Sequence, residues 1–361
     1  MPDPRLTRFL QAHGGDALVT ADPGLVRMLA GHASADIETG PSPYALPAIV
    51  IAPGDAEPVL VCSVDEAPER DRVESYEGFT VAPLDALGRA VEAFDRGVAL
   101  AGLGGGGVLV DGATLPAGLA MRLQGARPIG SELSGLGAVK TPAEVEAVEA
   151  SLRLCEAGQA AARAASVAGA NELDVWSALR GAIESAAGGR TALLADLVSG
   201  PRTQDVGGPP VDRVLADGDL VICDLVPCHD GIWGDSCAAW AVGEPSDAAR
   251  RLHAASSAAL DVTLAALRPG ATGHEVDAVA RAAMEEHGLS FPHHTGHGVG
   301  FHYHEEPRAV PDSATVLEPG MIIALEPGAY VDGLGVRVEV VSLITDDGHR
   351  VLSRHSLALE R

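Results

Sequence analysis

This sequence of 361 residues is short of lysine and of positive charge, and it contains no long uncharged apolar run. Lys140 is its only lysine, and 50 acidic residues against 25 Lys and Arg residues leave a formal net charge of −25. That charge repels phosphate backbones and anionic membranes, which argues against nucleic-acid and membrane partners. No stretch is long enough to span a bilayer, and the first residues lack the pattern of a secretion signal. The sequence therefore predicts a soluble, cytoplasmic protein that binds cations or neutral and zwitterionic small molecules.

Cysteines are also few. The five of them form no CxxC pair, and an odd number does not suggest a disulfide framework, so small buried thiols are predicted instead of a zinc knuckle or disulfides. An apolar content of 47% and a charged content of 21% are typical of a globular protein, and the length predicts two domains.

The domain boundary is predicted near Lys140. Residues 1–135 alternate short helical and strand patterns, which indicates a smaller α/β domain. A Gly- and Ser-rich stretch then leads into TPAE, where Thr141 can cap a helix and Glu144 can close a capping box. We expect a long helix from there to about residue 165.

The second domain, residues 136–361, has segregated helical and strand patterns. Helices are predicted at 172–187 and, interrupted by Pro269-Gly270, between 246 and 287. Strands are predicted at ALLADLVS, on both sides of CHDG, at MIIALEPGAYV and at GVRVEVVSLIT. This order indicates an α+β domain with antiparallel strand pairing.

The stretch HHTGHGVGFHYHEEP, residues 293–307, contains five histidines. A single histidine is more often a hydrogen-bonded structural residue than a metal ligand, so their density alone decides little. Spacing and available partners must decide which of them, if any, binds a metal.

Two aspartates lie in apolar surroundings around the CHDG turn. A two-residue hairpin loop at His229-Asp230 would place Asp224 directly opposite Asp235 on one face. Opposed carboxylates repel each other and need a cation, a shared proton or solvent. A solvated sheet edge would satisfy them, whereas the flanking Val, Ile, Leu and Trp residues favour burial.

Two glutamates lie in equally apolar runs, Glu326 in MIIALEPGAY and Glu339 in GVRVEVVSLIT. A buried glutamate needs a cationic partner, and a salt bridge to Arg337 could provide one. If the four acids and a histidine converge, they would instead form two oxygen-rich metal sites with shared carboxylates. Such sites suit divalent ions such as Mn²⁺, Co²⁺ or Zn²⁺.

The order of these residues resembles the five-ligand signature of the pita-bread (M24) metallopeptidases, which include methionine aminopeptidase, aminopeptidase P and prolidase. The matching residues, each inside its expected phrase, are Asp224, Asp235 eleven residues later, His297 in TGHGVG, Glu326 in LEPG and Glu339 in GVRVE. Residues 1–135 are similar to the creatinase/prolidase N-terminal domain. The resemblance therefore implies a pita-bread catalytic domain of the Xaa-Pro branch.

The resemblance also implies roles for the metal-binding residues. Asp235 and Glu339 would bridge two divalent ions, with Mn²⁺ favoured and Co²⁺ or Zn²⁺ as alternatives. Asp224 would complete one site, while His297 and Glu326 would complete the other. Two such ions polarise the scissile carbonyl and generate a nucleophile from water near neutral pH.

Further roles follow from the same resemblance. His293 and His304 would bind substrate and stabilise the tetrahedral intermediate, Arg337 would orient the carboxylates, and Glu326 would take and deliver the proton. Two histidines match no essential position and are interpreted as local structure: His294 and His302.

The sequence departs from the family pattern at two places. The family usually has a substrate-contacting histidine about seventeen residues before the first aspartate, where this chain has Gly207 or Gly208. The phrase Asp-x-Thr-Arg/Lys is replaced by Asp235-Ser236-Cys237-Ala238. Neither change removes a metal ligand, but both alter polar groups that set specificity.

The leading interpretation is a dinuclear metal-dependent hydrolase that cleaves an amide bond before proline, as an Xaa-Pro aminopeptidase or dipeptidase. The alternative is a C–N hydrolase of a small non-peptide substrate, as in creatinase and ectoine hydrolase relatives. A catalytically silent binding module is a third hypothesis, disfavoured because all five ligands are kept. The resemblance also implies a homodimer.

Overall fold

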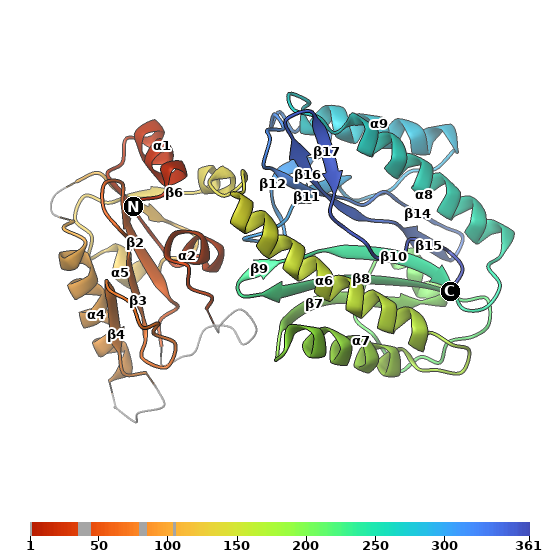
Figure 1. The fold of residues 1–361 in the computed structure, drawn as a ribbon, viewed down its shortest axis with the longest axis horizontal. Coiled ribbons are helices and arrows are strands. Elements are labelled where there is room, and N and C mark those ends of the chain that lie inside the picture. The colour runs from red at the N-terminus through yellow and green to blue at the C-terminus, as the bar shows by residue number, and fades with distance from the viewer. Residues whose placement is uncertain (1, 35–44, 79–84, 104–105) are drawn as a thin grey trace. The chain divides into compact units, whose positions relative to one another are not determined.

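The chain forms two compact units, Met1–Gly137 and Ala138–Arg361 (Figure 1). Whether these units correspond to the predicted domains, 1–135 and 136–361, as independently folding parts remains a prediction. The structure is a computed structural model that describes four stretches of the chain: 2–34, 45–78, 85–103 and 106–361.

The first unit is built on a six-stranded mixed sheet in the order β4-β3-β2-β1-β5-β6. Strand β1 pairs antiparallel with β2 and parallel with β5, and β3–β4 and β5–β6 are also parallel pairs. The strands are β1 (Ala17–Thr20), β2 (Ile49–Pro53), β3 (Val59–Ser63), β4 (Val73–Tyr76), β5 (Val108–Asp111) and β6 (Arg127–Ile129). The helices are α1 (Pro4–His13), α2 (Pro23–Ala30), α4 (Ala86–Leu100) and α5 (Ala117–Ala120).

Both faces of this sheet are buried. Successive residues of a strand point to opposite faces, so Leu18 packs in a cluster with α1 and α2, whereas Val19 packs in a second cluster with α4. Strand β2 repeats the pattern with Val50 and Ile51. Helices therefore cover both faces of the sheet, and the predicted α/β architecture of this part of the chain is confirmed.

The second unit has three antiparallel sheets. The first has the order β10-β8-β7 with β9 paired to β8, the second β12-β11-β13-β16-β17, and the third is β14-β15. Their bounds are β7 (Ala192–Ser199), β8 (Leu220–His229), β9 (Ile232–Trp233), β10 (Ser236–Ala241), β11 (Gly296–Gly298), β12 (Glu305–Ala309), β13 (Ile322–Leu325), β14 (Gly328–Val331), β15 (Leu334–Arg337), β16 (Val340–Thr345) and β17 (Gly348–Val351). The predicted antiparallel pairing is confirmed.

Two pairs of helices enclose these sheets, with α6 and α7 on one side and α8 and α9 on the other (Figure 1). The predicted capping box is present, because Thr141 and Glu144 exchange hydrogen bonds at the start of α6. The four helices lie close to their predicted bounds: α6 (Pro142–Ala165), α7 (Glu172–Ala187), α8 (Asp247–Ala266) and α9 (Gly273–Glu286). Within the described residues, none of the helices has the length and apolar character needed to span a membrane.

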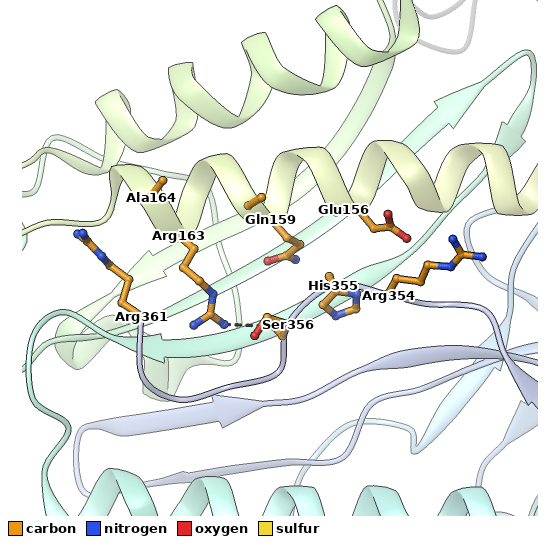
Figure 2. A pocket seen from close by; sticks show the side chains of 9 residues that line it. Glu156, Gln159, Arg163, Ala164, Arg354, His355, Ser356 and Arg361 are labelled. Atoms are coloured by element: carbon orange, nitrogen blue, oxygen red, sulfur yellow. Dashed lines mark hydrogen bonds between the residues drawn. The ribbon is translucent and has the colours of Figure 1, made fainter.

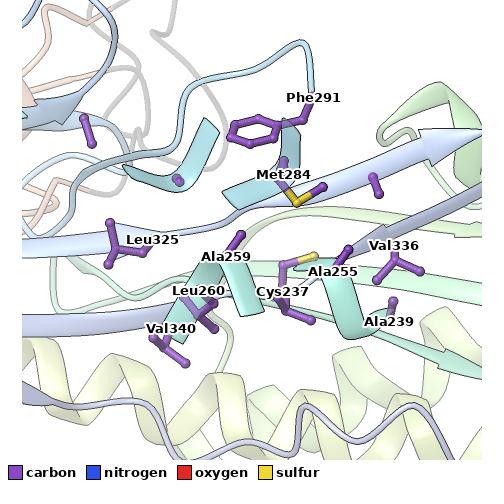
Figure 3. Close-up of a cluster of buried hydrophobic side chains, with 14 of the residues drawn as sticks. Cys237, Ala239, Ala255, Ala259, Leu260, Met284, Phe291, Leu325, Val336 and Val340 are labelled. Atoms are coloured by element: carbon purple, nitrogen blue, oxygen red, sulfur yellow. The ribbon is translucent and has the colours of Figure 1, made fainter. Parts of the chain in front are cut away.

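The strands between the helix pairs contribute to two separate cores. On β10, Cys237 and Ala239 join the core beneath α8 and α9, whereas Ala238 and Trp240 join the core beneath α6 and α7. Figure 3 shows the first of these cores, where Cys237 and Ala239 lie near the small side chains of α8. Both faces of β10 are therefore buried, and any polar residue on this strand lies in the interior.

The register of the β8–β9–β10 hairpin differs from the expected one. Its turn is Asp230-Gly231, both with positive φ, and His229 pairs with Ile232. This shift places Asp224 opposite Cys237 instead of Asp235. Asp-Gly is a strongly preferred hairpin turn because both residues tolerate the left-handed conformation, so the predicted loop at His229-Asp230 was wrong by one residue.

The two predicted strands near the C-terminal end are each divided at a glutamate. Strands β13 and β14 are separated by Glu326-Pro327, and β15 and β16 by Val338-Glu339. In both cases the flanking strands belong to different sheets. Each glutamate therefore lies where the chain leaves one sheet for another, and its side chain is buried there.

A buried ion pair connects the start of this unit to the segment after the histidines. Lys140 Nζ binds Glu305 Oε1, with side-chain exposures of 0% and 4%. Glu305 Oε2 also accepts a hydrogen bond of 3.0 Å from the backbone N–H of His302. The pair thus anchors the residues before α6 to the loop between β11 and β12.

Replacing Lys140 by Met should destabilise the protein by about 3–5 kcal/mol, because Glu305 would remain buried without its cation. The double replacement Lys140→Met/Glu305→Met should recover much of that loss, since no buried charge would remain. Chemical denaturation monitored by circular dichroism measures both effects. Arg350→Met, which breaks the more exposed pair with Glu149, is the control and should cost at most about 1 kcal/mol. An equal cost for both single variants would contradict this account.

Candidate metal centre

Separate segments of the second unit bring the predicted metal-binding side chains together. Asp235 comes from the loop between β9 and β10, His297 from β11, and Glu326 follows β13. His297 Nε2 lies 3.6 Å from Asp235 Oδ2 and 3.4 Å from Glu326 Oε1. Donor atoms of Asp235, His297 and Glu339 lie within 4.8 Å of one another.

Glu339 connects this group to Asp224 on β8. Donor atoms of Asp224, Cys237 and Glu339 also lie within 4.8 Å of one another, so Glu339 belongs to both groups. The backbone supports this arrangement, because Glu339 N–H donates to the carbonyl of Cys237 over 3.0 Å. The structure thus gathers all five predicted residues into one cluster, while their roles as ligands remain a prediction.

Several carboxylate oxygens in this cluster are buried without a partner. Glu339 is 1% exposed, and neither Oε1 nor Oε2 has a hydrogen-bond partner among the described residues. Asp224 Oδ1 is likewise buried without a described hydrogen-bond partner. Unsatisfied buried carboxylate oxygens are costly, and a divalent cation is the group that would satisfy them. The donor set therefore fits a metal site.

The electrostatics of the cluster indicate the same need for positive charge. Burial, together with neighbouring acids, holds the pKa values of Asp235 and Glu339 well above their usual range. Burial also raises the pKa of Asp224 to about 6, although Arg337 opposes the shift. Burial opposes ionisation of Glu326 too, but hydrogen bonds from His294 and His297 hold its pKa well below the usual value.

Arg337, at the end of β15, provides one fixed positive charge beside the cluster. It forms an ion pair with Asp224, and its Nε lies 3.7 Å from Glu326 Oε2. The same Nε donates to Cys237 Sγ over 3.3 Å, and Nη1 donates to the carbonyl of Val206 over 3.0 Å. This buried guanidinium therefore orients two of the predicted ligands, in keeping with its expected place.

The hydrogen bonding of His297 leaves one ring nitrogen free to coordinate. Its Nδ1 lies 3.0 Å from the carbonyl oxygen of Gly298. Because a carbonyl oxygen only accepts, Nδ1 carries a proton, and Nε2, which faces Asp235 and Glu326, is the ring nitrogen that could coordinate a metal. Donation from Nδ1 to a carbonyl is the arrangement that orients a metal-binding histidine.

The other predicted histidines lie beside the cluster. His293 Nε2 is 3.0 Å from the Tyr330 hydroxyl, and burial lowers the His293 pKa to about 4. The ring of His304 lies against that of His297, with centroids 3.9 Å apart, and burial lowers the pKa of His304 to about 3. Both rings are therefore neutral at pH 7.

His294 lies in the site, contrary to its interpretation as local structure. Its Nε2 is 2.7 Å from Glu326 Oε1, and its ring meets those of His297 and His304 at right angles. His302, by contrast, contacts Glu305 and contributes to the local structure of the loop. Spacing alone did not separate these two histidines, because only the fold places His294 against Glu326.

A cavity of about 440 Å³ opens beside the cluster. Its wall includes two of the clustered residues, Asp224 and Glu326, together with Arg337 and the three histidines 293, 294 and 304. The remaining lining residues are Leu194, Ala195, Asp196, Val206, Val226 and Tyr303. Asp196 was missed in the sequence, although a lone acid in the apolar run ALLADLVS is the same signal that identified Asp224.

A second cavity, of about 490 Å³, lies between α6 and the C-terminal segment (Figure 2). Figure 2 shows Arg163, Arg354 and Arg361 around it, with Glu156 as the one acid in its lining. A lining rich in guanidinium groups repels divalent cations, so this larger cavity is not the candidate metal centre.

Comparison with known proteins agrees with this geometry. The probable dipeptidase PepE of Mycobacterium tuberculosis is 36% identical over 186 residues, which are 50% of this chain and 49% of that protein. The Xaa-Pro dipeptidase of Pyrococcus furiosus is 31% identical over 231 residues, 63% of this chain and 66% of that protein. The chain thus spans about half the length of the first of these curated relatives.

The fold is that of prolidases. The crystal structure of the prolidase from Pyrococcus horikoshii covers 98% of this chain and 98% of its own, with a TM-score of 0.81 at 22% identity. That agreement confirms the predicted pita-bread domain and the α/β domain before it.

The family assignment rests on the second unit. The model of metallopeptidase family M24 matches residues 146–346, more than half of the chain, and this range contains all five clustered side chains. The chain therefore belongs to metallopeptidase family M24.

Proposed function

We propose that the chain is a dinuclear metal-dependent hydrolase of Xaa-Pro peptide bonds, acting as an aminopeptidase or a dipeptidase. The observation that carries this proposal is the group of buried, unsatisfied carboxylates around His297 Nε2, beside a cavity of about 440 Å³. The similarity of this chain to proteins named Xaa-Pro dipeptidases supports a peptide substrate.

In this proposal Asp235 and Glu339 are the carboxylates shared by two ions, Asp224 completes one site, and His297 and Glu326 complete the other. The membership of Glu339 in two donor groups supports its bridging role. Four carboxylates and one imidazole favour hard or borderline ions, and we propose Mn²⁺, with Co²⁺ and Zn²⁺ as alternatives.

Cys237 is not assigned as a ligand, although its sulfur belongs to one donor group. Burial raises the pKa of the Cys237 thiol well above its usual value. Its Sγ also accepts a hydrogen bond from Arg337 Nε. The thiol therefore helps to hold the guanidinium that orients Asp224.

Bound divalent ions would polarise the scissile carbonyl and activate water. In this proposal Glu326, whose pKa is held low, would accept the proton from that water and deliver it to the leaving nitrogen. His304, a neutral ring, can donate a hydrogen bond to substrate and to the oxygen that becomes negative. His293 donates its Nδ1–H to the carbonyl of His294 over 2.8 Å, so its proposed contact with substrate requires that this hydrogen bond be exchanged. Tyr330 positions His293 through the hydroxyl contact.

A second candidate is a C–N hydrolase of a small non-peptide substrate. It is favoured by Gly207, which supplies no side chain where the family usually has a substrate-contacting histidine. Loss of that donor changes what the cavity can bind without touching the cluster. A silent binding module has no comparable support, since the five donors converge.

We also propose a cytoplasmic location and a homodimer. The five cysteines are all buried and free, which suits a reducing compartment, and the net charge of −25 disfavours nucleic acid and membranes as partners. The homodimer is supported by the family resemblance.

Purified protein should bind two equivalents of Mn²⁺, Co²⁺ or Zn²⁺ and hydrolyse Xaa-Pro dipeptides or longer Xaa-Pro peptides. Asp235→Ala should lower kcat/KM by about a thousandfold or more and reduce the bound metal, because one carboxylate serves both sites. Metal analysis and a substrate panel that includes N-terminal-Met peptides and cyclic amidines measure both. Asp261→Ala, on the exposed face of α8, is the control. Turnover of a cyclic amidine alone would support the second candidate, and a protein unable to bind metal would exclude the dinuclear mechanism.

Glu339→Gln should change stability differently with and without metal. In a chelator the free energy of unfolding should move by no more than about 1 kcal/mol, because Gln resembles the protonated acid that burial favours. With Mn²⁺ at a hundred times its Kd, the wild type should gain about 2.7 kcal/mol and the variant distinctly less. Thermal denaturation under both conditions provides the measurement. An equal gain for both proteins would remove Glu339 from the ligand set.

A further inference from the structure

Asp196 is a carboxylate in the wall of the active-site cavity that the proposed mechanism does not use. It lies in the middle of β7, directly opposite Asp224 of β8 in the strand register. Among the described residues, no hydrogen bond or ion pair satisfies its side chain. Besides Asp224, the cavity wall includes four apolar residues from β7, β8 and the segment before Gly207: Leu194, Ala195, Val206 and Val226.

Gly207 provides the space for this carboxylate. A Cβ atom at position 207 would collide with the Asp196 side chain, so any larger residue there would displace it. Gly207 does not have a left-handed φ, and its backbone therefore does not itself require glycine. The Asp196 carboxylate occupies the volume that a side chain at position 207 would fill. Its position therefore depends on glycine at 207.

The charge on Asp196 differs from the other acids of the cavity in having no described cation. Asp224 is paired with Arg337, and Glu326 contacts His294. Like charges directly opposite each other on paired strands destabilise a sheet, and Asp196 and Asp224 are such a pair. An acid kept at this position at a cost in stability is expected to have a role in function.

We propose that Asp196 is a specificity-determining residue that binds a positively charged nitrogen of the substrate, so that the enzyme prefers cationic substrates. The inference rests on the proposed peptidase function and adds the substrate class. This nitrogen belongs to the residue before the scissile bond. It is either a guanidinium or amine of that residue's side chain or the terminal ammonium of that residue. The net charge of −25 adds to this preference by attracting cations toward the cavity.

Matched dipeptides test the proposal, because citrulline has the shape of arginine without its charge. With metal-loaded wild type, kcat/KM for Arg-Pro should exceed that for citrulline-Pro by about ten- to hundredfold, mainly through KM. Asp196→Asn should bring the ratio close to one without changing bound metal. Asp261→Asn, which removes an exposed acid of α8, should keep the wild-type ratio.

A second arm identifies which nitrogen is bound. In one outcome Arg-Pro and citrulline-Pro react equally with the wild type, and Asp196→Asn raises KM for both dipeptides but not for their desamino analogues. Asp196 would then bind the terminal ammonium of the substrate. An unchanged KM for every substrate in Asp196→Asn would overturn the proposal. A fall in bound metal with no change in the Arg-Pro to citrulline-Pro ratio would also overturn it, because Asp196 would then act on the metal centre.

Failure of the proposed function has a different signature. Protein with two bound ions that cleaves neither the dipeptides nor longer Xaa-Pro peptides would reject the peptidase proposal. In that case calorimetric binding of L-argininamide and L-citrullinamide tests Asp196 directly. Weaker binding of either amide in Asp196→Asn than in the wild type would uphold the cation site, and binding of both amides that is unchanged in Asp196→Asn would reject it.

Discussion

The structure of the second unit depends on placing mutually repelling carboxylates in an apolar interior. Asp224, Asp235, Glu326 and Glu339 converge where water is excluded, and Arg337 offsets part of their charge. No single sheet could present all of them. The chain instead passes from one sheet to another at Glu326 and at Glu339. The two aspartates come from a third segment, Asp224 from β8 and Asp235 from the loop before β10. The remaining positive charge that this arrangement requires is the physical basis for assigning a metal centre.

The departures from the family pattern affect the cavity and leave the cluster intact. Cys237 takes the place of a threonine, yet its sulfur accepts a hydrogen bond from Arg337, which in turn holds Asp224. Gly207 removes a bulky donor, and Asp196 uses the space that is left. We therefore expect metal binding and substrate choice to be separable in this chain, since the proposed ligands and the proposed substrate contact are different side chains.

Features encoded by neighbouring residues could be predicted from the sequence. The Thr141–Glu144 capping box marked the start of α6, and apolar alternation marked β7 and β8. The register of the β8–β10 hairpin was missed because the Asp230-Gly231 turn was not weighed against the neighbouring dipeptide. The placement of His294 could not be predicted, because it depends on contact with a glutamate 32 residues away in the chain. Asp196 did have a local signal, as a lone acid in the apolar run ALLADLVS, but its proximity to Gly207 depends on the fold.

The distribution of cationic side chains has a consequence for behaviour in alkaline solution. The one lysine, Lys140, has a fully buried side chain, so the positive charge on the surface comes from arginine and, at lower pH, from histidine. A guanidinium group stays protonated beyond about pH 12, whereas a lysine amine titrates near 10.4. The surface charge of this protein should therefore remain nearly constant across the alkaline range in which lysine-rich proteins lose theirs.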